Sequence, residues 1–532
     1  MRTLQRARRA QPTEGALRAA HFTIPDLWRR SARLYARRLA VVSEDVELTY
    51  AQLDERAHRL ANAFGGLGLR DRDRIAVLAE TRPEYIETYM AAAMLGVTLV
   101  ALNIRQRSDE LAHCLQLTRP RLLLASPGQA HVADELRDST AGLEQLVLFP
   151  ERAGEAASDY ERLLVSASVL PPRIPVEPED IHCILFTSGT TGRPKGAMIS
   201  QRASVMRAAR CADWFGLSEA DGMIGWIPMF HTGGDECVKA TFLTGGKFAT
   251  FETVDPAAMF RAIEKHRLTW TAMLPGMITD FLHHRDRARH DLSSLRFGLG
   301  YANMMPQVVE EFTSTLGAAF WDTYGQTESS FVVALDLVRP GDTPSLRKWP
   351  APLLDIRIVD GNMRELPDEV PGECVVRGPS VMSGYVEAPA ATEEVFRGGW
   401  LHTGDILTRH EDGSYSYVDR LKYLIKTGGE NVYPAEVEQV IASHPAVREA
   451  CVVSVPDERW GETIKAVVSL DAAASLSGEE VRTWCRAHLP GFKCPRYVQF
   501  VATKDLPRSI TGKILRHELE KLEATEDQRV AD

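Results

Sequence analysis

The sequence lacks the features that would tie a protein to a membrane or to a secretory route. No apolar run approaches the roughly 20 residues that a membrane-spanning helix needs. The N-terminus is rich in arginine, but no apolar segment follows it, so a secretory signal is not predicted. We expect residues 1–20 to form a loose basic leader. An organellar transit peptide is the weaker alternative, because the segment is poor in serine.

The sequence also gives little support for metal clusters, disulfides or polyanion binding. The eight cysteines are scattered, with no C-x-x-C pair and no His/Cys group at metal-ligand spacing. We therefore expect reduced thiols in a cytoplasmic protein. With 62 basic and 72 acidic residues the net charge is −10, so neither nucleic acid nor membrane insertion is predicted.

The chain is long enough for two or more domains, since 532 residues exceed what one hydrophobic core usually supports. Helical periodicity at residues 50–67, 85–95 and 256–266 alternates with strand-like segments at 74–78, 98–102 and 247–251. Such alternation predicts an α/β fold with parallel sheets flanked by helices. Beyond about residue 350, short strands punctuated by glycine and proline predict a β-rich subdomain. We place the large N-terminal domain at residues 21–419 and a small α+β domain at 423–532.

A glycine- and hydroxyl-rich loop follows the apolar segment 184–186. Its backbone N–H groups and hydroxyls can surround phosphate oxygens, and its lysine adds a positive charge. The loop differs from G-x-x-x-x-G-K-[ST], because no Ser or Thr follows the lysine. On composition alone, a Ser/Gly-rich surface turn is an equal alternative. The candidate ligands are Thr187, Ser188, Gly189, Thr190, Thr191, Gly192 and Lys195.

Further motifs follow this loop in a fixed order along the chain. They occupy residues 228–231 (PMFH), 324–328 (YGQTE), 399–405 (GWLHTGD), 419–422 (DRLK), 428–434 (GGENVYP) and 507–513 (PRSITGK). Together with the loop, they resemble the adenylate-forming superfamily of acyl-CoA synthetases, nonribosomal adenylation domains and luciferases. The resemblance implies an enzyme that uses ATP and Mg²⁺ to make an acyl-adenylate and then passes the acyl group to coenzyme A.

The resemblance also assigns roles around the nucleotide. Without the companion motifs, each of these segments would be an ordinary turn or cap. The implied contacts are Tyr324 with adenine, Asp322 with its amino group, Thr327 with the α-phosphate, Glu328 with Mg²⁺, Asp405 with the ribose hydroxyls, Arg420 with the nucleotide, and Lys513 between carboxylate and α-phosphate. A carboxylate is well suited to accept from two hydroxyls or to bind Mg²⁺.

Lys513 belongs to the small domain, so the implied site is completed only when that domain closes over the large one. Relatives use two orientations of the small domain for the two half-reactions. The resemblance implies a hinge at residues 420–422 with Lys422 as its pivot. A solvated linker lysine is the plain alternative for Lys422.

The segment 428–438 resembles the version found in acyl-CoA synthetases, which favours coenzyme A as the acyl acceptor. Gly428, Gly429 and Glu430 are the candidate residues there. Lys493 and Arg496 are further candidates for CoA phosphates, although a solvated surface charge is the simpler interpretation for each.

The acid pocket is expected near the segments that contain His231 and Tyr301. Its candidates are Trp226, His231, Asp235, Glu236, Tyr301 and Asn303, with Lys239 close by. Where many relatives have Gly-Gly-Ala-Pro, residues 300–303 are GYAN. A tyrosine in place of a glycine should narrow the tunnel and exclude long fatty chains.

Residues 301–303, 339–342 and 349–350 are similar to carnitine/crotonobetaine-CoA ligases. In that interpretation Asp235 and Glu236 face a cationic head group; alternatively they are exposed or paired with Lys239. Short-to-medium or aryl acids are the broad competitors.

Two other functions remain open at this stage. One is a stand-alone adenylating enzyme that loads a carrier-protein thiol. The other is a catalytically silent nucleotide-binding protein, which the joint presence of Glu328, Asp405 and Lys513 opposes. A homodimer is the oligomeric state we consider.

Overall fold

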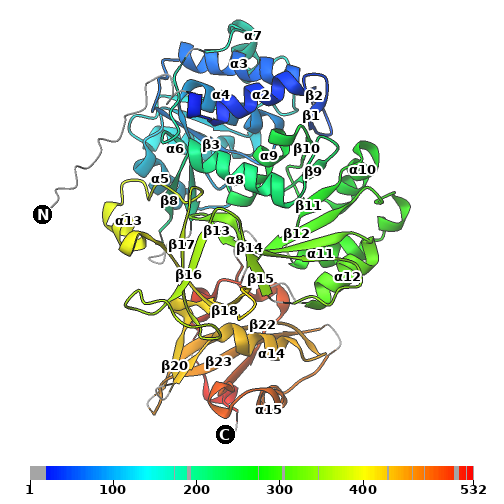
Figure 1. Cartoon of the computed structure of the whole chain (residues 1–532), viewed down its shortest axis with the longest axis vertical. Coiled ribbons are helices and arrows are strands. Elements are labelled where there is room, and N and C mark those ends of the chain that lie inside the picture. Colours follow the sequence, from blue (N-terminus) through cyan, green and yellow to red (C-terminus); the bar gives the residue numbers. More distant parts are fainter. Residues whose placement is uncertain are drawn as a thin grey trace, which may run out of the picture.

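The structure is a computed structural model of the 532-residue chain. It describes residues 19–172, 174–187, 193–273, 275–301, 306–345, 347–427, 430–457, 459–471, 474–508, 514–522 and 524–530. Figure 1 shows helices and strands layered along the long axis, with the C-terminal unit at one end.

The first sheet has the strand order β6-β5-β3-β4-β7-β8 within the described residues. Its neighbours run parallel except at β8, which turns back against β7. The strands are β3 (Arg74–Leu78), β4 (Thr98–Ala101), β5 (Leu122–Ala125), β6 (Gln145–Leu148), β7 (Ile181–Thr187) and β8 (Lys195–Ser200). The accompanying helices are α3 (Tyr50–Gly66), α4 (Pro83–Leu95), α5 (Ser108–Thr118), α6 (Ala130–Ser139) and α7 (Asp159–Ser166).

The second sheet joins a parallel half to an antiparallel half. The described strands follow the order β16-β17-β18-β19-β15-β14-β13-β12-β11-β9-β10-β1-β2. The part from β1 through β10, β9, β11 and β12 to β13 is parallel: β1 (Leu39–Val42), β9 (Gly222–Gly225), β10 (Lys247–Thr250), β11 (Trp270–Ala272), β12 (Phe297–Tyr301) and β13 (Ala319–Gln326). β2 (Glu47–Thr49) pairs antiparallel with β1 at the edge.

The antiparallel half is the predicted β-rich subdomain, and it continues the same sheet. Its strands are β14 (Ser330–Val338), β15 (Arg347–Pro350), β16 (Asp355–Val359), β17 (Gly372–Arg377), β18 (Leu401–Arg409) and β19 (Tyr415–Arg420). Helices of this part of the chain are α2 (Ile24–Leu34), α8 (Gln201–Trp214), α9 (Thr232–Thr244), α10 (Pro256–His266), α11 (Pro275–His283), α12 (Pro306–Leu316) and α13 (Pro389–Val395). β13 and β14 link the two halves.

Local sequence explains several of these boundaries. Thr49 and Gln52 form a capping box that starts α3. Asp255 caps α10, and proline follows it at the first helical position. Gly245 ends α9 with a φ of 82°, a left-handed conformation that glycine adopts without a steric penalty. The strand at 74–78 and the helix at 256–266 match the predicted bounds, whereas the predicted helix at 85–95 begins earlier, at Pro83.

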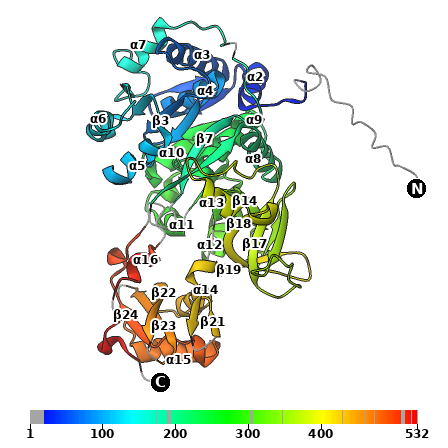
Figure 2. The same cartoon turned by 90° about the vertical axis from the view of Figure 1, so that its left-hand side faces the viewer.

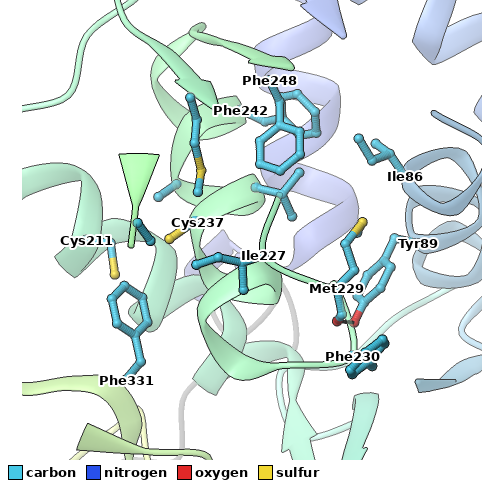
Figure 3. Close-up of a cluster of buried hydrophobic side chains, with 14 of the residues drawn as sticks. Ile86, Tyr89, Cys211, Ile227, Met229, Phe230, Cys237, Phe242, Phe248 and Phe331 are labelled. Carbon is cyan, nitrogen blue, oxygen red and sulfur yellow. Dashed lines mark hydrogen bonds between the residues drawn. The ribbon is translucent and has the colours of Figure 1, made fainter. Parts of the chain in front are cut away.

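Helix α9 lies inside the main hydrophobic core. Figure 3 shows Cys237 and Phe242 on this helix, with Phe331 of β14 near one end of the cluster and Phe248 of β10 near the other. The α9 residues from Gly233 to Phe242 are all buried. A helix that is buried all round must find partners for any charge that it carries.

The C-terminal unit has its own sheet and core. Within the described residues, the order is β21-β20-β23-β22, and β24 pairs parallel with β23. The elements are β20 (Ile425–Thr427), β21 (Glu430–Val432), β22 (Val447–Asp457), β23 (Gly461–Leu470), β24 (Tyr497–Phe500), α14 (Pro434–Ala442), α15 (Gly478–His488) and α16 (Arg516–Leu519). Figure 2 shows this unit beyond β19. Along the chain, β19 is the last strand of the large sheet, and it ends at Arg420, just before the unit begins.

All eight cysteines are buried free thiols. Across the described ranges, none of the helices combines the length and apolar composition needed to span a bilayer.

Candidate active site

The two described phosphate-loop candidates, Thr187 and Lys195, lie on β7 and β8. Thr187 ends β7 and pairs with Lys195, the first residue of β8. The Lys195 ammonium lies 5.3 Å from the centre of the Tyr385 ring. Both ends of the predicted loop are therefore fixed by the sheet. Ser188, Gly189, Thr190, Thr191 and Gly192 lie outside the described residues.

A second hairpin brings the nucleotide candidates of the antiparallel half together. Asp405 of β18 is paired in register with Arg420 of β19, and Arg420 Nε lies 3.1 Å from Asp405 Oδ1. The Tyr324 hydroxyl donates to Asp405 Oδ2 at 2.9 Å. Asp405 raises the pKa of the Arg420 guanidinium, because the opposite charge favours the protonated form. These three predicted residues form one cluster, in which Tyr324 and Asp405 are buried and the Arg420 side chain is 35% exposed.

Asp322 lies two residues before Tyr324 on β13, so both side chains leave the same face of the strand. Its Oδ2 is 2.6 Å from the ammonium of buried Lys348. Burial raises the pKa of the Asp322 carboxyl, and Lys348 opposes that shift. Among the described residues, Oδ1 of Asp322 has no hydrogen-bond partner. A buried acceptor of this kind fits a ligand's amino group.

The turn from β13 to β14 carries Thr327 and Glu328. The Tyr385 hydroxyl donates to Glu328 Oε1 at 2.8 Å. A Cβ atom at Gly325 would lie 2.3 Å from the carbonyl oxygen of Ser330, so only glycine fits there. The strand pairing shifts register between Tyr324 and Gln326 as the turn begins. Position 325 of the YGQTE segment must therefore be glycine, because the backbone of β14 lies so close to it.

The acid-site candidates gather near the carboxyl ends of parallel strands. Trp226 directly follows β9, and its indole N–H donates to the carbonyl of Ala272 at the end of β11. His231 caps α9, with its ring centre 4.9 Å from that of Phe230. Burial lowers the pKa of His231 to about 4, so the ring is neutral at neutral pH. The positive charge of Arg105 lowers the pKa of His231 further.

Asp235 and Glu236 point into the protein interior. Asp235 pairs with Lys239 one turn along α9, and both are buried. Glu236 pairs with Arg207 of α8 across 3.2 Å, and both side chains are 0% exposed. Cations of the chain itself therefore engage both carboxylates. The predicted alternative in which Asp235 pairs with Lys239 is the arrangement observed, and we leave both acids out of the acid site.

The remaining acid-site candidates are Tyr301 and Asn303. Tyr301 ends β12, but its side chain is outside the described set, as is Asn303.

Among the described C-terminal candidates, Glu430 is exposed, whereas Lys493 and Arg496 are half-buried. Glu430 begins β21 at the surface. Lys493 Nζ lies 2.7 Å from both carboxylate oxygens of Glu436. The Arg496 guanidinium carbon lies 5.2 Å from the Trp460 ring centre. Gly428, Gly429 and Lys513 lie outside the described residues.

The predicted hinge falls between the two sheets. Lys422 occupies a short helical turn, Leu421–Tyr423, after β19 and before β20. Its ammonium lies 4.8 Å from the Tyr423 ring, and Arg516 lies 4.5 Å from the same ring.

Family models match both parts of the chain. The model described as AMP-binding enzyme matches residues 28–386, and that described as AMP-binding enzyme C-terminal domain matches residues 436–513. The chain belongs to the AMP-binding enzyme family. The predicted adenylate-forming superfamily and its α/β fold are thereby confirmed.

Relatives of this AMP-binding enzyme span nearly its whole length. A feruloyl-CoA synthase from Amycolatopsis is 36% identical over 495 residues, covering 92% of this chain and 97% of the relative. An indoleacetate–CoA ligase from Aromatoleum aromaticum is 33% identical over 504 residues, covering 93% and 97%. A crotonobetaine/carnitine–CoA ligase from Salmonella arizonae is 31% identical over 519 residues, covering 93% and 98%.

A solved structure agrees with these relatives. ATP-bound MatB from Rhodopseudomonas palustris superposes with a TM-score of 0.85 at 27% identity, covering 94% of this chain and 99% of that one. The AMP-binding enzyme is an AMP-forming acid–CoA ligase whose substrates are a carboxylic acid, ATP and coenzyme A.

Sequence reasoning missed the residues that support the predicted ones. Tyr385 holds Glu328, Lys348 holds Asp322, and Arg207 engages Glu236. A signal existed for Arg207, which lies in a helical stripe of buried small residues at 203, 204, 208 and 211. A cation in such a stripe predicts a buried partner.

Proposed function

We propose that this ligase activates a compact acid that carries no charge besides its carboxylate, with an aryl or arylalkyl acid as the first candidate and a short-to-medium aliphatic acid as the second. A betaine-type acid is the disfavoured class. The observation that carries this choice is the pairing of both nearby acids: Asp235 with Lys239, and Glu236 with Arg207. A carboxylate already neutralised inside the core offers little attraction to a cationic head group.

The residues around the proposed acid site favour the same class of acid. Trp226, Met229 and Phe230 are apolar and buried, and the neighbouring His231 is held neutral. Ferulate and indoleacetate, named for two relatives, are aromatic acids. Tyr301 is proposed to shorten the tunnel and Asn303 to contact the acid. An apolar site with few polar groups favours such ligands.

For the first half-reaction, we assign the nucleotide to the cluster on the large domain. Asp405 accepts from the ribose hydroxyls beside Arg420, Tyr324 contacts adenine, and Asp322 accepts from the adenine amino group. Residues 187–192 and Lys195 surround the phosphates, and Thr327 contacts the α-phosphate. Lys513 neutralises charge between the acid and that phosphate, because joining two anions requires it.

Glu328 is the proposed Mg²⁺ ligand. Tyr385 fixes one carboxylate oxygen, while Oε2 accepts no hydrogen bond from the described residues. This fits Mg²⁺, which is usually bound by one or two carboxylates together with substrate phosphates. When bound, the ion would neutralise charge on the phosphates.

For the second half-reaction, we assign coenzyme A to Gly428, Gly429, Glu430, Lys493 and Arg496, with Lys422 as the pivot between orientations. Rotation of the small domain would move Lys513 away from the acyl-adenylate and bring the segment beginning at residue 428 to it.

The domain limits at 419 and 423, the homodimer and the cytoplasmic location also remain predictions.

The test is a CoA-dependent AMP-release screen over cinnamic, indoleacetic, short aliphatic and betaine-type acids. We expect the highest kcat/KM with an aryl acid, and Asp235→Asn should leave the ranking of acids unchanged. Preference for carnitine or crotonobetaine would overturn the acid assignment. Acyl-AMP without thioester would indicate a carrier-protein acceptor, and no pyrophosphate exchange with any acid would indicate a silent nucleotide-binding protein.

A further inference from the structure

The turn that carries Thr327 and Glu328 is backed by an ion pair that has no assigned part in the reaction. Arg207 of α8 and Glu236 of α9 are both fully buried. Their elements are far from the turn in sequence, yet both side chains bond to it directly. This pair therefore connects two core helices to the segment that we assign to Mg²⁺ and the α-phosphate.

Arg207 contacts the backbone of the turn. Its Nη2 donates to the carbonyl of Thr327 at 3.0 Å, and Nε donates to the carbonyl of Ser380 at 2.8 Å. Two residues beyond Ser380, the Met382 N–H donates to the carbonyl of Glu328 at 2.8 Å. A guanidinium presents its donors in a fixed plane, so it sets the relative positions of the carbonyls that it binds.

Glu236 holds the other side of the turn. Its Oε2 accepts from the Ser330 hydroxyl at 2.6 Å, and its Oε1 accepts from the Phe331 N–H at 3.3 Å and from Thr232 Oγ1 at 2.7 Å. All the bonds to the turn fall within five residues of chain, from 327 to 331.

The backbone at Ser330 is strained. Its φ is 117°, in a region that residues with a Cβ atom rarely adopt. Strained conformations persist where the surroundings over-determine them, and they concentrate at functional sites. The Ser330 hydroxyl bond to Glu236 is one such restraint.

We propose that Arg207 and Glu236 are positioning residues that hold the strained 327–331 turn in the shape required for Glu328 to bind Mg²⁺ during adenylation. This inference rests on the proposed role of Glu328. A buried ion pair is weak evidence for stability, since well-packed apolar residues often serve as well. Its many bonds to one turn indicate that it acts on the geometry of that turn.

The matched comparison lies on the same helix. Asp235 and Lys239 form a second buried ion pair, but their contacts are with Cys183 and with the ring of Tyr89 rather than with the turn. Removing both charges with Asp235→Asn/Lys239→Met perturbs the same core. This double substitution should leave the half-saturating Mg²⁺ concentration unchanged.

The experiment is a Mg²⁺ titration of full-length Glu236→Gln with two readouts: acid-dependent pyrophosphate exchange, and calorimetric binding of Mg²⁺ in the presence of a non-hydrolysable ATP analogue. Substitution of residues that orient a metal ligand typically costs about 10–100-fold in metal affinity or activity. We expect the half-saturating Mg²⁺ concentration to rise within that range. Acyl transfer to CoA from supplied acyl-AMP, which needs no pyrophosphate chemistry, should change less.

Arg207→Lys is the second variant if Glu236→Gln does not fold. It keeps the positive charge beside Glu236 but loses the planar set of donors, so a rise in the Mg²⁺ requirement is again expected.

Substitutions at Ser330 test the strain separately. Ser330→Gly loses the hydroxyl but adopts a positive φ without penalty, whereas Ser330→Ala loses the hydroxyl and keeps the strain. We expect the alanine variant to need more Mg²⁺ than the glycine variant. Equal behaviour of the two would contradict a role for Glu236 in holding strain.

Glu328→Gln separates failure of the inference from failure of its premise. If it leaves the Mg²⁺ requirement unchanged, the assignment of Glu328 is wrong. If it raises the requirement while Glu236→Gln behaves like Asp235→Asn/Lys239→Met, the assignment of Glu328 survives and the positioning role is overturned.

Discussion

The two parts of the proposed site are built in different ways. On the large domain, Tyr324, Asp405 and Arg420 stand on strands of one sheet, and buried Asp405 contacts both of the other residues. On the C-terminal unit, Lys493 lies on a short turn and pairs with Glu436, whose side chain is 38% exposed. The first group is positioned by the fold before any ligand arrives. The second group depends on where its unit sits, so substitutions in the two parts should affect different steps.

Substitution of Lys513 should give the largest difference between the rates of the two half-reactions. We expect Lys513→Ala to lower the rate of acyl-adenylate formation on the order of 10²–10³-fold, because a charge that stabilises the transition state is removed. Thioester formation from supplied acyl-AMP should be largely retained. Single-turnover assays of each half-reaction measure this. Lys504→Ala, an exposed lysine of the same unit, is the control; equal losses in both half-reactions would contradict the assignment.

Substitutions in the nucleotide cluster of the large domain should weaken ATP binding. Asp405→Asn replaces a charged acceptor next to Arg420 and should raise the KM for ATP about 10–100-fold, the range expected for hydrogen bonds to a charged group. The KM for CoA should stay nearly constant. Initial rates at varied ATP measure the effect, with exposed Asp412→Asn on the same hairpin as control. An unchanged KM for ATP would count against the ribose role.

The fold was largely predictable because local signals and global structure agree. The strand at 74–78 and the helix at 256–266 have the expected periodicity and bounds. The nucleotide candidates could be proposed because each lies in a short motif, and their roles stay predictions. Asp235 and Glu236 were harder, since two adjacent acids look like a solvated face, and only the surroundings of α9 show that the helix is buried all round.

The supporting residues were not predictable from spacing. Tyr385 lies 57 residues from the Glu328 that it holds, and Arg207 lies 173 residues from Ser380. Contacts over such separations are set by how the sheet and helices pack, and no local pattern marks them. Buried polar groups nevertheless require partners, so an arginine in an apolar stripe is a usable signal.

Stability against acid should also differ between the two parts. Burial lowers the pKa of His231 from 6.5 to about 4, so the unfolded chain binds the proton more readily. The resulting stability is present above pH 6.5 and is lost as the pH falls toward 4; between pH 6.5 and 5 the loss is about 1.5 kcal/mol. Urea unfolding should show a smaller pH dependence for His231→Asn.

His488 on the C-terminal unit provides the matched control for that measurement. It is exposed on α15, so His488→Asn is the same substitution made at the surface instead of in the core. An identical pH dependence for both variants would show that burial of His231 makes no contribution.

The smallest effect is expected at Lys493. Its partly exposed pair with Glu436 is of a kind worth about 1 kcal/mol or less, so Lys493→Gln should raise the KM for CoA at most about fivefold. Added salt should shrink the difference, because exposed charges are screened. Lys521→Gln removes a more exposed pair with Glu518 on the same unit and should leave the KM for CoA unchanged. A much larger rise at Lys493, or any change in the KM for ATP, would mean that this turn is as firmly built into the site as the strands of the large domain.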